Sequence, residues 1–247
     1  MRALLLALSC SACAAPDHLS RVPVGTYLLV VGDDPVLDVH SPFTGMLVER
    51  YEVRGAPTVV TITRDGRKAI VAREGGLTVQ PLFDDRGPSF LELGCTPAAI
   101  ATLDRRTRVV AAVPDELLVV HLGSGEVLAR HGTQLPAPTG LEVDPTGAHV
   151  VVRGVSGACR IDLATGSREA VEARLEPPSY ADVLPQDAGF VRVHPGGVYA
   201  FAALPDEDAI AVLDLERGEL TGTFPTGPRP RWIAITFSRD RRPLGGD

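Results

Sequence analysis

The stretch FVRVHPGGVYAFAALPDEDAIAVLDLERGELTGTF, residues 190–224, decides the expected fold. It contains four short runs rich in apolar and β-branched residues, at residues 190–194, 198–204, 209–215 and 219–224. Turn-forming residues separate the runs at 195–197, 205–208 and 217–218. Short runs of this kind, bounded by Gly, Pro and Asp, are typical of β-strands joined by tight turns. The stretch therefore predicts a four-stranded antiparallel sheet.

The same unit recurs along the chain. A glycine follows each expected third strand, at Gly45, Gly87, Gly125, Gly166 and Gly218, in steps of 42, 38, 41 and 52 residues. A hairpin turn often needs a positive φ, which glycine adopts without steric cost. A repeat of about 40 residues that contains four strands is the signature of a β-propeller. The five glycines predict an all-β propeller of five four-stranded blades.

The two ends of the repeat region complement each other. Residues 26–31, 36–40 and 46–53 form a blade that lacks its inner strand, whereas residues 232–237 form an inner strand that lacks a blade. We expect the C-terminal strand to complete the N-terminal blade and close the ring. Such pairing would also remove a free strand edge, which would otherwise promote aggregation.

Length and charge limit the functional classes. The chain has 247 residues, of which 45% are hydrophobic, enough for one large β domain. Its net charge of −7 argues against a nucleic-acid partner, because phosphates require a basic surface. We expect a monomer, with the propeller at residues 26–240 and a C-terminal tail at 241–247.

The N-terminus has the layout of a secretory signal. One arginine precedes a short apolar run, and small residues follow at positions 9–15. Residues 1–14 are expected to be a signal peptide, and residues 15–25 a tether. Signal peptidase could cut after Ala14, or Cys13 could be the lipidated residue of a bacterial lipoprotein. Either route predicts export, to the periplasm or to an outer-membrane anchor.

Two cysteines, Cys95 and Cys159, remain in the mature body. An exported protein could form a disulfide. The repeat places Cys95 at the start of an inner strand and Cys159 in the third strand of the next blade. This separation favours two buried thiols over a disulfide.

A binding face can be predicted from the propeller geometry. The turns between second and third strands share one face with the connections between blades, and four of the five turns carry carboxylates. One long insertion, residues 177–187, should reach the same face, where long loops often bind ligands. The alternative is that these turns are polar only because they are solvated. The candidate binding residues are Asp33, Asp34, Asp115, Glu116, Tyr180, Asp182, Asp206, Glu207, Asp208, Arg229 and Arg231.

No established catalytic or metal-binding motif occurs. The six histidines form neither His-x-His nor His-Glu-x-x-His spacing. His40 and His121 end third strands at the position that Asp162 and Asp214 occupy in other blades, which indicates a structural role in the turn. We therefore expect no cofactor, metal or catalytic residue.

Residues 198–227, followed by Pro230 and the inner strand at 233–235, resemble the YVTN-type propeller repeat. Residues 160–166 (RIDLATG) resemble another copy of its V-x-V-x-D-x-x-x-G strand. The family is similar to lactonase-like and surface-layer propellers, most of which have seven blades. Its Asp and Gly are turn residues, so the resemblance transfers no catalytic residue.

Two functions follow from this sequence. The first is a non-enzymatic, exported propeller that binds a protein or another ligand. The alternative is a lactonase-like hydrolase with a site at the central channel. The inner strands are mostly apolar, with Glu142 and Arg192 as exceptions, which favours the binding protein.

Overall fold

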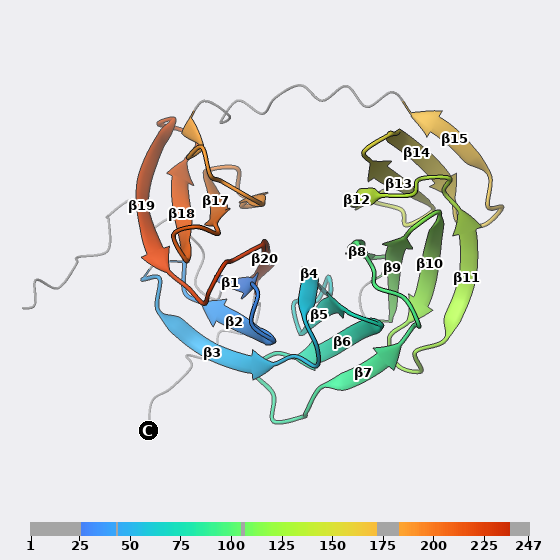
Figure 1. Cartoon of the computed structure of the whole chain (residues 1–247), viewed down its shortest axis with the longest axis horizontal. Coiled ribbons are helices and arrows are strands. Elements are labelled where there is room, and N and C mark those ends of the chain that lie inside the picture. The colour runs from blue at the N-terminus through green and yellow to red at the C-terminus, as the bar shows by residue number, and fades with distance from the viewer. Residues whose placement is uncertain (1–25, 43, 105–106, 172–182, 238–247) are drawn as a thin grey trace, which may run out of the picture.

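The computed structural model describes residues 26–42, 44–104, 107–171 and 183–237. It contains five four-stranded antiparallel sheets arranged as the blades of a β-propeller (Figure 1). The predicted fold class and the predicted number of blades are therefore confirmed. No helix in the described ranges is long and apolar enough to cross a membrane.

Blade one combines strands from both ends of the repeat region, whereas blade two is built from the four strands that follow β3 in the chain. Blade one has the strand order β20-β1-β2-β3. Its strands are β20 (Trp232–Phe237), β1 (Thr26–Val31), β2 (Val36–His40) and β3 (Leu47–Glu52). Blade two consists of β4 (Pro57–Ile62), β5 (Lys68–Arg73), β6 (Gly76–Pro81) and β7 (Ser89–Glu92).

The other blades follow in chain order. Blade three consists of β8 (Ala99–Thr102), β9 (Arg108–Val113), β10 (Glu116–His121) and β11 (Val127–Gly132). Blade four consists of β12 (Pro138–Val143), β13 (His149–Gly154), β14 (Gly157–Asp162) and β15 (Arg168–Val171). Blade five consists of β16 (Val191–Val193), β17 (Tyr199–Leu204), β18 (Ala209–Asp214) and β19 (Glu219–Pro225).

The apolar content of a strand depends on its position in the blade. Every residue of the middle strands β17 and β18 is buried, and both strands read as nearly continuous apolar runs. The outer strand β19 is mostly exposed and contains polar residues. A middle strand is covered on both faces by neighbouring elements, so apolar residues are favoured at every position.

The C-terminal strand completes the first blade. β20 pairs antiparallel with β1 along its whole length, from Thr26 opposite Phe237 to Val31 opposite Trp232. Ile233, Ala234 and Ile235 of β20 are all buried. The predicted closure between the two ends of the repeat region is confirmed.

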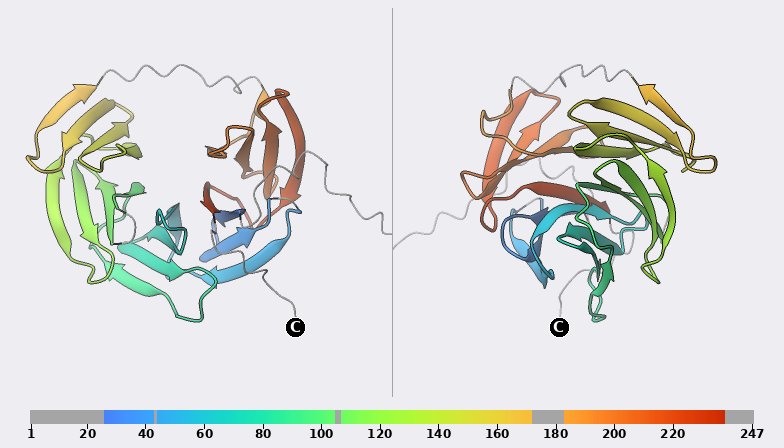
Figure 2. Two further views of the ribbon diagram at one scale, coloured as in Figure 1. Left: turned by 180° about the vertical axis from the view of Figure 1, so that it is seen from behind. Right: turned by 45° about the vertical axis from the view of Figure 1, so that its right-hand side comes forward.

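Four hydrophobic clusters fill the spaces between successive blades in the order five, one, two, three, four. None of the clusters formed by described residues joins blade four to blade five. The free face of blade five instead carries its own cluster, which includes Ala200, Ala202 and Leu213, and Val183, Leu184 and Ala188 pack against it. Figure 2 shows blades four and five standing apart at this side of the ring.

Four of the five repeat glycines have the predicted backbone conformation. Gly45, Gly125, Gly166 and Gly218 have φ values of 67°, 74°, 72° and 65°. The prediction is wrong for Gly87, whose φ is not positive. Blade two connects β6 to β7 through residues 82–88, and in this loop it is Phe83 that has a positive φ, of 54°.

The two cysteines are separate free thiols, Cys95 half-buried and Cys159 buried. Burial raises the pKa of both thiols, which keeps them protonated. The expected position of Cys95 is wrong, because β8 begins at Ala99 and Cys95 lies in the connection before it. Cys95 is therefore less buried than the repeat implied.

Candidate functional site

The turns between second and third strands meet the connections between blades at one face of the ring. The backbone N–H of Asp33 donates to the carbonyl oxygen of Pro228 over 3.2 Å. In blade three, the N–H of Asp115 donates to Leu135 O over 3.0 Å. These hydrogen bonds tie each turn to the neighbouring connection between blades.

Four candidate residues gather where blade five joins blade one. Arg231 Nε lies 2.6 Å from one carboxylate oxygen of Asp33, and Arg229 Nε lies 3.7 Å from the other. The backbone N–H of Arg229 donates to Asp208 Oδ1 over 2.8 Å, and Arg229 has a φ of 46°. The ion pairs are partly exposed, so each adds little stability. Their main effect is to hold the connection from β19 to β20 in one conformation.

An ion pair between a buried carboxylate and a half-exposed arginine lies next to this cluster in blade one. The Asp38 side chain is 3% exposed and accepts two hydrogen bonds from Arg50, at 2.7 and 2.8 Å. The hydrogen bond from Arg50 to Asp38 raises the pKa of the guanidinium. A bidentate pair of this kind fixes orientation as well as charge.

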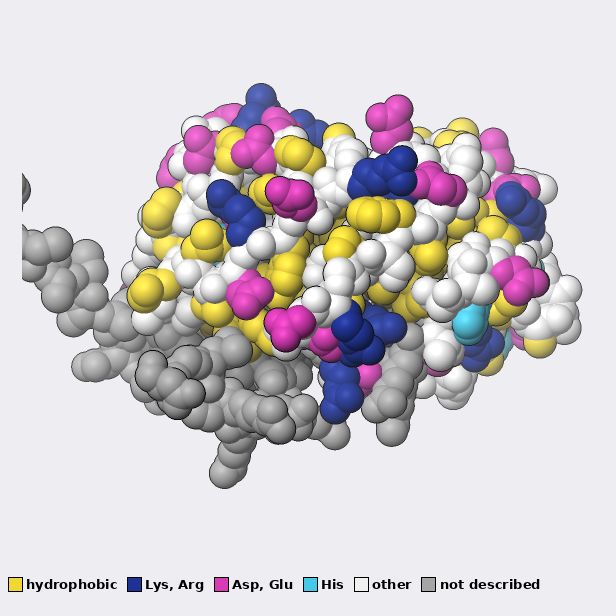
Figure 3. All heavy atoms as spheres, turned by 90° about the horizontal axis from the view of Figure 1, so that it is seen from below, with side chains coloured by type: hydrophobic (Ala, Val, Ile, Leu, Met, Phe, Trp, Pro, Cys, Tyr) yellow, Lys and Arg dark blue, Asp and Glu magenta, His cyan; other side chains and the backbone are white. Residues whose placement is uncertain are grey.

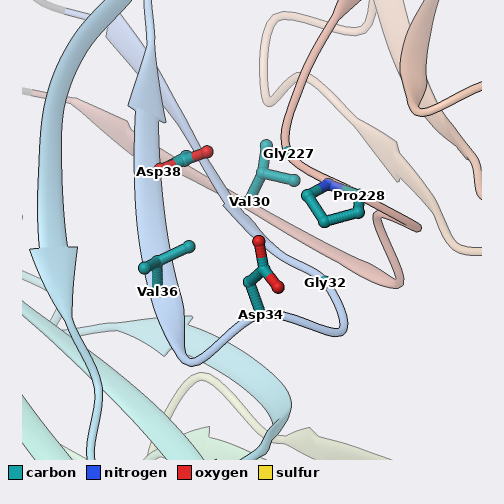
Figure 4. Close-up of a pocket in the computed structure, with 7 residues that line it drawn as sticks. All are labelled: Val30, Gly32, Asp34, Val36, Asp38, Gly227 and Pro228. Carbon is teal, nitrogen blue, oxygen red and sulfur yellow. The ribbon is translucent and has the colours of Figure 1, made fainter.

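Asp34 and Asp38 both line a small cavity beside Gly227 and Pro228 (Figure 4). Its volume is about 10 Å³, which is room for roughly one water molecule. The backbones are tightly packed here, because a Cβ on Gly32 would lie 2.3 Å from Pro228 O. The cavity is too small for an organic ligand.

The other candidate residues that the structure describes lie on the same face without joining the cluster. Asp206 and Glu207 are exposed, and their side chains form no hydrogen bond or ion pair among the described residues. Glu116 pairs with Arg130 of its own blade at 2.8 Å. Asp115 adopts a positive φ of 61° in its turn. The contacts do not link these acids into one continuous ring, and Tyr180, Asp182 and Cys13 lie outside the described residues.

The opposite face is organised by the last residue of the third strand in four of the five blades, all except blade two, whose third strand ends at Pro81. Asp162 accepts backbone N–H bonds from Ala164 and Thr165, and Asp214 accepts them from Glu216 and Arg217. His40 Nδ1 lies 3.1 Å from the carbonyl oxygen of Gly45. His121 Nδ1 lies 3.2 Å from the backbone nitrogen of Ser124. The predicted structural role of this position is confirmed.

Blade four adds a histidine between two carboxylates on that opposite face. His149 Nδ1 lies 3.0 Å from Asp144, and Nε2 lies 3.5 Å from Asp162. Desolvation raises the pKa of Asp144, but hydrogen bonds from His149, Thr146 and Ala148 outweigh it and hold that pKa well below its usual value. Hydrogen bonds from Thr165 lower the pKa of Asp162. No group of three or more His, Cys, Asp or Glu residues in the described ranges is arranged to hold a metal ion.

The sequence reasoning missed the pair of Asp38 and Arg50. A signal was present, because Asp38 interrupts the apolar strand β2 and the hairpin centred on Gly45 sets Arg50 opposite Asp38. A charged residue in such a strand needs a partner, and the antiparallel register identifies it.

Comparison with known proteins supports the fold alone. No protein-family model matches the chain, and no curated protein is similar to it at a significant level. Hydrazine synthase of Kuenenia stuttgartiensis is structurally similar, with a TM-score of 0.56, 15% sequence identity, and coverage of 81% of this chain and 83% of that chain. A chain of a nidogen/laminin complex gives a TM-score of 0.63 and 13% identity, covering 87% of this chain and 100% of that chain.

Proposed function

We propose that this protein is a non-enzymatic, exported β-propeller that binds a partner protein or another ligand through the face formed by its inter-blade connections. One observation supports this function above the others. The junction of blades five and one pairs Asp33 with Arg229 and Arg231, and leaves the carboxylates of Asp206 and Glu207 exposed beside it. Exposed polar groups on a rigid, hydrogen-bonded loop are suited to binding.

The structural comparison agrees with a role in protein association. One similar chain comes from a complex of nidogen with laminin. A similar fold does not by itself imply a similar function, so the residues of the face must be tested directly.

The test is co-purification followed by charge reversal. The full chain is expressed with its own N-terminus in a bacterial host, the envelope is solubilised, and bound molecules are identified by mass spectrometry. Asp206 and Glu207 are then replaced together by lysine. Asp208 is left unchanged because its carboxylate holds the Arg229 backbone. We expect a stoichiometric partner to be lost with the double variant.

The matched control reverses Glu126, in the turn between β10 and β11, and Glu169, on β15, two exposed acids away from the candidate face. This variant should retain the partner. A partner that stays bound to the Asp206→Lys/Glu207→Lys variant would contradict the proposed face.

Export and lipidation at Cys13 belong to the same proposal, together with membership of the YVTN-type repeat family. The short apolar run and small residues at the N-terminus support export. Intact-mass measurement of the mature protein tests it: a diacylated N-terminal Cys13 supports a lipoprotein, and a start at Ala15 supports plain secretion. An unprocessed Met1 would contradict both routes.

A further inference from the structure

A second surface lies on the outer rim, between blades one and two. There the end of β3 and the loop between β6 and β7 border a groove of about 570 Å³. The loop projects from the rim beside β3 in Figure 1. Figure 3 views this rim directly and shows basic, acidic and hydrophobic side chains mixed along it. The groove includes the start of the connection from β3 to β4, but it shares no residue with the cluster at the junction of blades five and one.

One wall of the groove is the free edge of a β-strand. Five consecutive residues, 50–54, line it. Residues 50–52 belong to β3, which ends at Glu52, and residues 53–54 belong to the connection that follows. Because side chains alternate between the two faces of a strand, three consecutive strand residues can line one groove only if the backbone takes part. The N–H of Val53 donates to Pro35 O, towards β2. Hydrogen-bonding directions alternate along a strand, so the backbone N–H and C=O groups of Glu52 point away from β2 and have no strand to pair with.

The groove also has a polar side chain that is buried and only partly bonded. Gln80 lines the groove although it is only 3% exposed. Its Nε2 donates to Pro81 O over 2.7 Å, and its Oε1 has no hydrogen-bond partner among the described residues. This oxygen is not one of the fully enclosed, unpaired side-chain atoms of the described residues, so a donor can still reach it. Gln80 therefore presents an acceptor to any occupant.

The unpaired charge in the groove is negative. Arg50 is paired with Asp38, and Arg86 Nε lies 2.9 Å from Asp84 Oδ1. The hydrogen bond from Arg86 holds the pKa of Asp84 at about 2, so this pair stays ionised. The remaining groove arginine, Arg54, lies 3.5 Å from Glu92, which Arg73 also contacts at 2.7 Å, and its guanidinium lies over the half-exposed ring of Phe90. Glu52 and Asp85, in contrast, line the groove, are exposed and have no ion pair within the described ranges.

We propose that this groove is a peptide-binding site, in which an extended segment of a partner protein with basic side chains pairs with the outer edge of β3. Main-chain hydrogen bonds to Glu52 supply the pairing, as in other cases where a peptide adds a strand to a sheet. The carboxylates of Glu52 and Asp85 select lysine or arginine at alternate positions, because those side chains point to one side of the added strand. Phe90 offers an apolar contact at the other end.

The test uses a random heptapeptide library displayed on phage and selected against the full-length protein. We expect enriched peptides to carry Lys or Arg at alternate positions. Synthetic copies should bind at least tenfold more weakly to the Gly87→Trp variant. Gly87 lines the groove, and a Cβ placed on it meets no atom within 4 Å, so tryptophan can fill the groove without displacing the fold.

The matched control is Gly222→Trp, on β19, where a Cβ likewise meets nothing within 4 Å. It should bind the peptides as the unmodified protein does. The proposal is overturned if no enriched peptide distinguishes Gly87→Trp from Gly222→Trp.

A second readout separates strand pairing from simple charge attraction. The enriched peptide is methylated on alternate backbone nitrogens, in each of the two possible registers. One register should lose at least tenfold in affinity, because it blocks the amides that face β3. Equal affinity of both methylated peptides would overturn pairing with the β3 edge. Since Asp206 and Glu207 are unchanged in these variants, the result does not depend on the function proposed for the other face.

Discussion

Blade five makes two very different contacts with the rest of the ring. On one face, Tyr199, Phe201 and Ile210 pack against blade one, including Ile233 and Ile235 of β20. On its other face, Ala200, Ala202 and Leu213 form a cluster covered by Val183, Leu184 and Ala188 rather than by blade four. Large side chains fill the first interface, whereas the second is rich in alanine.

Blade four also has one face that packs against its neighbour and one that does not. Its face towards blade three contains Val150, Val152 and Ile161, which share one core with that blade. Its other face carries a row of paired positions that is mostly polar, Glu142, Val151, Arg160 and Glu169. Blades four and five therefore cover their facing sides in different ways, blade four with polar side chains and blade five with residues 183–188. Among the described residues, a shared core joins blades five and one, where the two ends of the repeat region meet, and none joins blades four and five.

The largest test of this comparison removes the strand that joins the two ends. A chain ending at Thr226 lacks β20, so β1 loses its pairing partner and blade five loses Ile233 and Ile235 from its core. We expect the cooperative thermal transition, followed by circular dichroism, to be lost. A chain ending at Phe237 is the control. Coincident melting curves for the two chains would show that β20 does not hold the ring together.

A smaller test compares the two faces of a single strand. Ile210 and Leu213 both lie on β18, and both are fully buried. Ile210 belongs to the core between blades five and one, and Leu213 to the cluster on the other face of blade five. We expect Ile210→Ala to lower the free energy of unfolding by about 4 kcal/mol and Leu213→Ala by about 2 kcal/mol. The covering residues 183–188 can move into the space that Leu213 leaves, whereas two packed blades cannot. Urea unfolding measures both values, and equal losses would contradict the comparison.

The turn carboxylates of blades four and five provide a further comparison. Asp214 and Asp162 end the third strands of their blades and bind the same kind of backbone N–H groups, but their side chains are 5% and 29% exposed. Asp214→Ala should lower the free energy of unfolding by about 1–3 kcal/mol, because it leaves partly buried backbone donors unpaired beside a buried position. Asp162→Ala should cost less, since water can replace the carboxylate. An equal or larger loss for Asp162→Ala, measured by urea unfolding, would be inconsistent with this view.

The smallest expected effects are two pH dependences, one in each blade. Burial lowers the pKa of His194 in blade five, and hydrogen bonds from Thr165 lower that of Asp162 in blade four. A group whose pKa is lower in the folded state stabilises the protein above its unfolded pKa, and that stabilisation is lost as the pH falls. Stability should therefore fall below about pH 6.5 because of His194, and again below about pH 4 because of Asp162.

Two substitutions separate these pH windows. His194→Asn, whose amide oxygen can accept the N–H of Gly196 that now donates to Nδ1, should remove the dependence between pH 7 and 5. Asp162→Asn should instead make the fall below pH 4 less steep, while Asp144 and Asp84, whose pKa values are also lowered, still contribute to it. Melting temperatures measured from pH 3 to 8 test both, and an unchanged profile in either variant would rule out the corresponding group.

Most of the fold could be predicted from the sequence, because each strand and turn depends on the residue types within a few positions of it. The runs at 198–204 and 209–215 and the glycine at 218 predict a hairpin unit wherever they recur. The missing inner strand of blade one and the spare strand at 232–237 predict the closure, since each is incomplete alone. The errors at Gly87 and Cys95 fall in loops whose lengths differ from those of the other repeats. There the local pattern does not show which residues correspond to which position of the repeat.

The sequence by itself thus determined the strands, the five blades and the closure, because hydrophobic period and turn chemistry act over a few residues. Only the tertiary structure decided which side chains meet. It set Asp33 against Arg231, 198 positions away in the chain, and set residues 50–54 beside residues 84–88 to form the rim groove. It also left blades four and five without a shared core among the described residues, which no local pattern predicts. Such contacts depend on the twist and tilt of whole blades, and these are settled only when all the cores pack together.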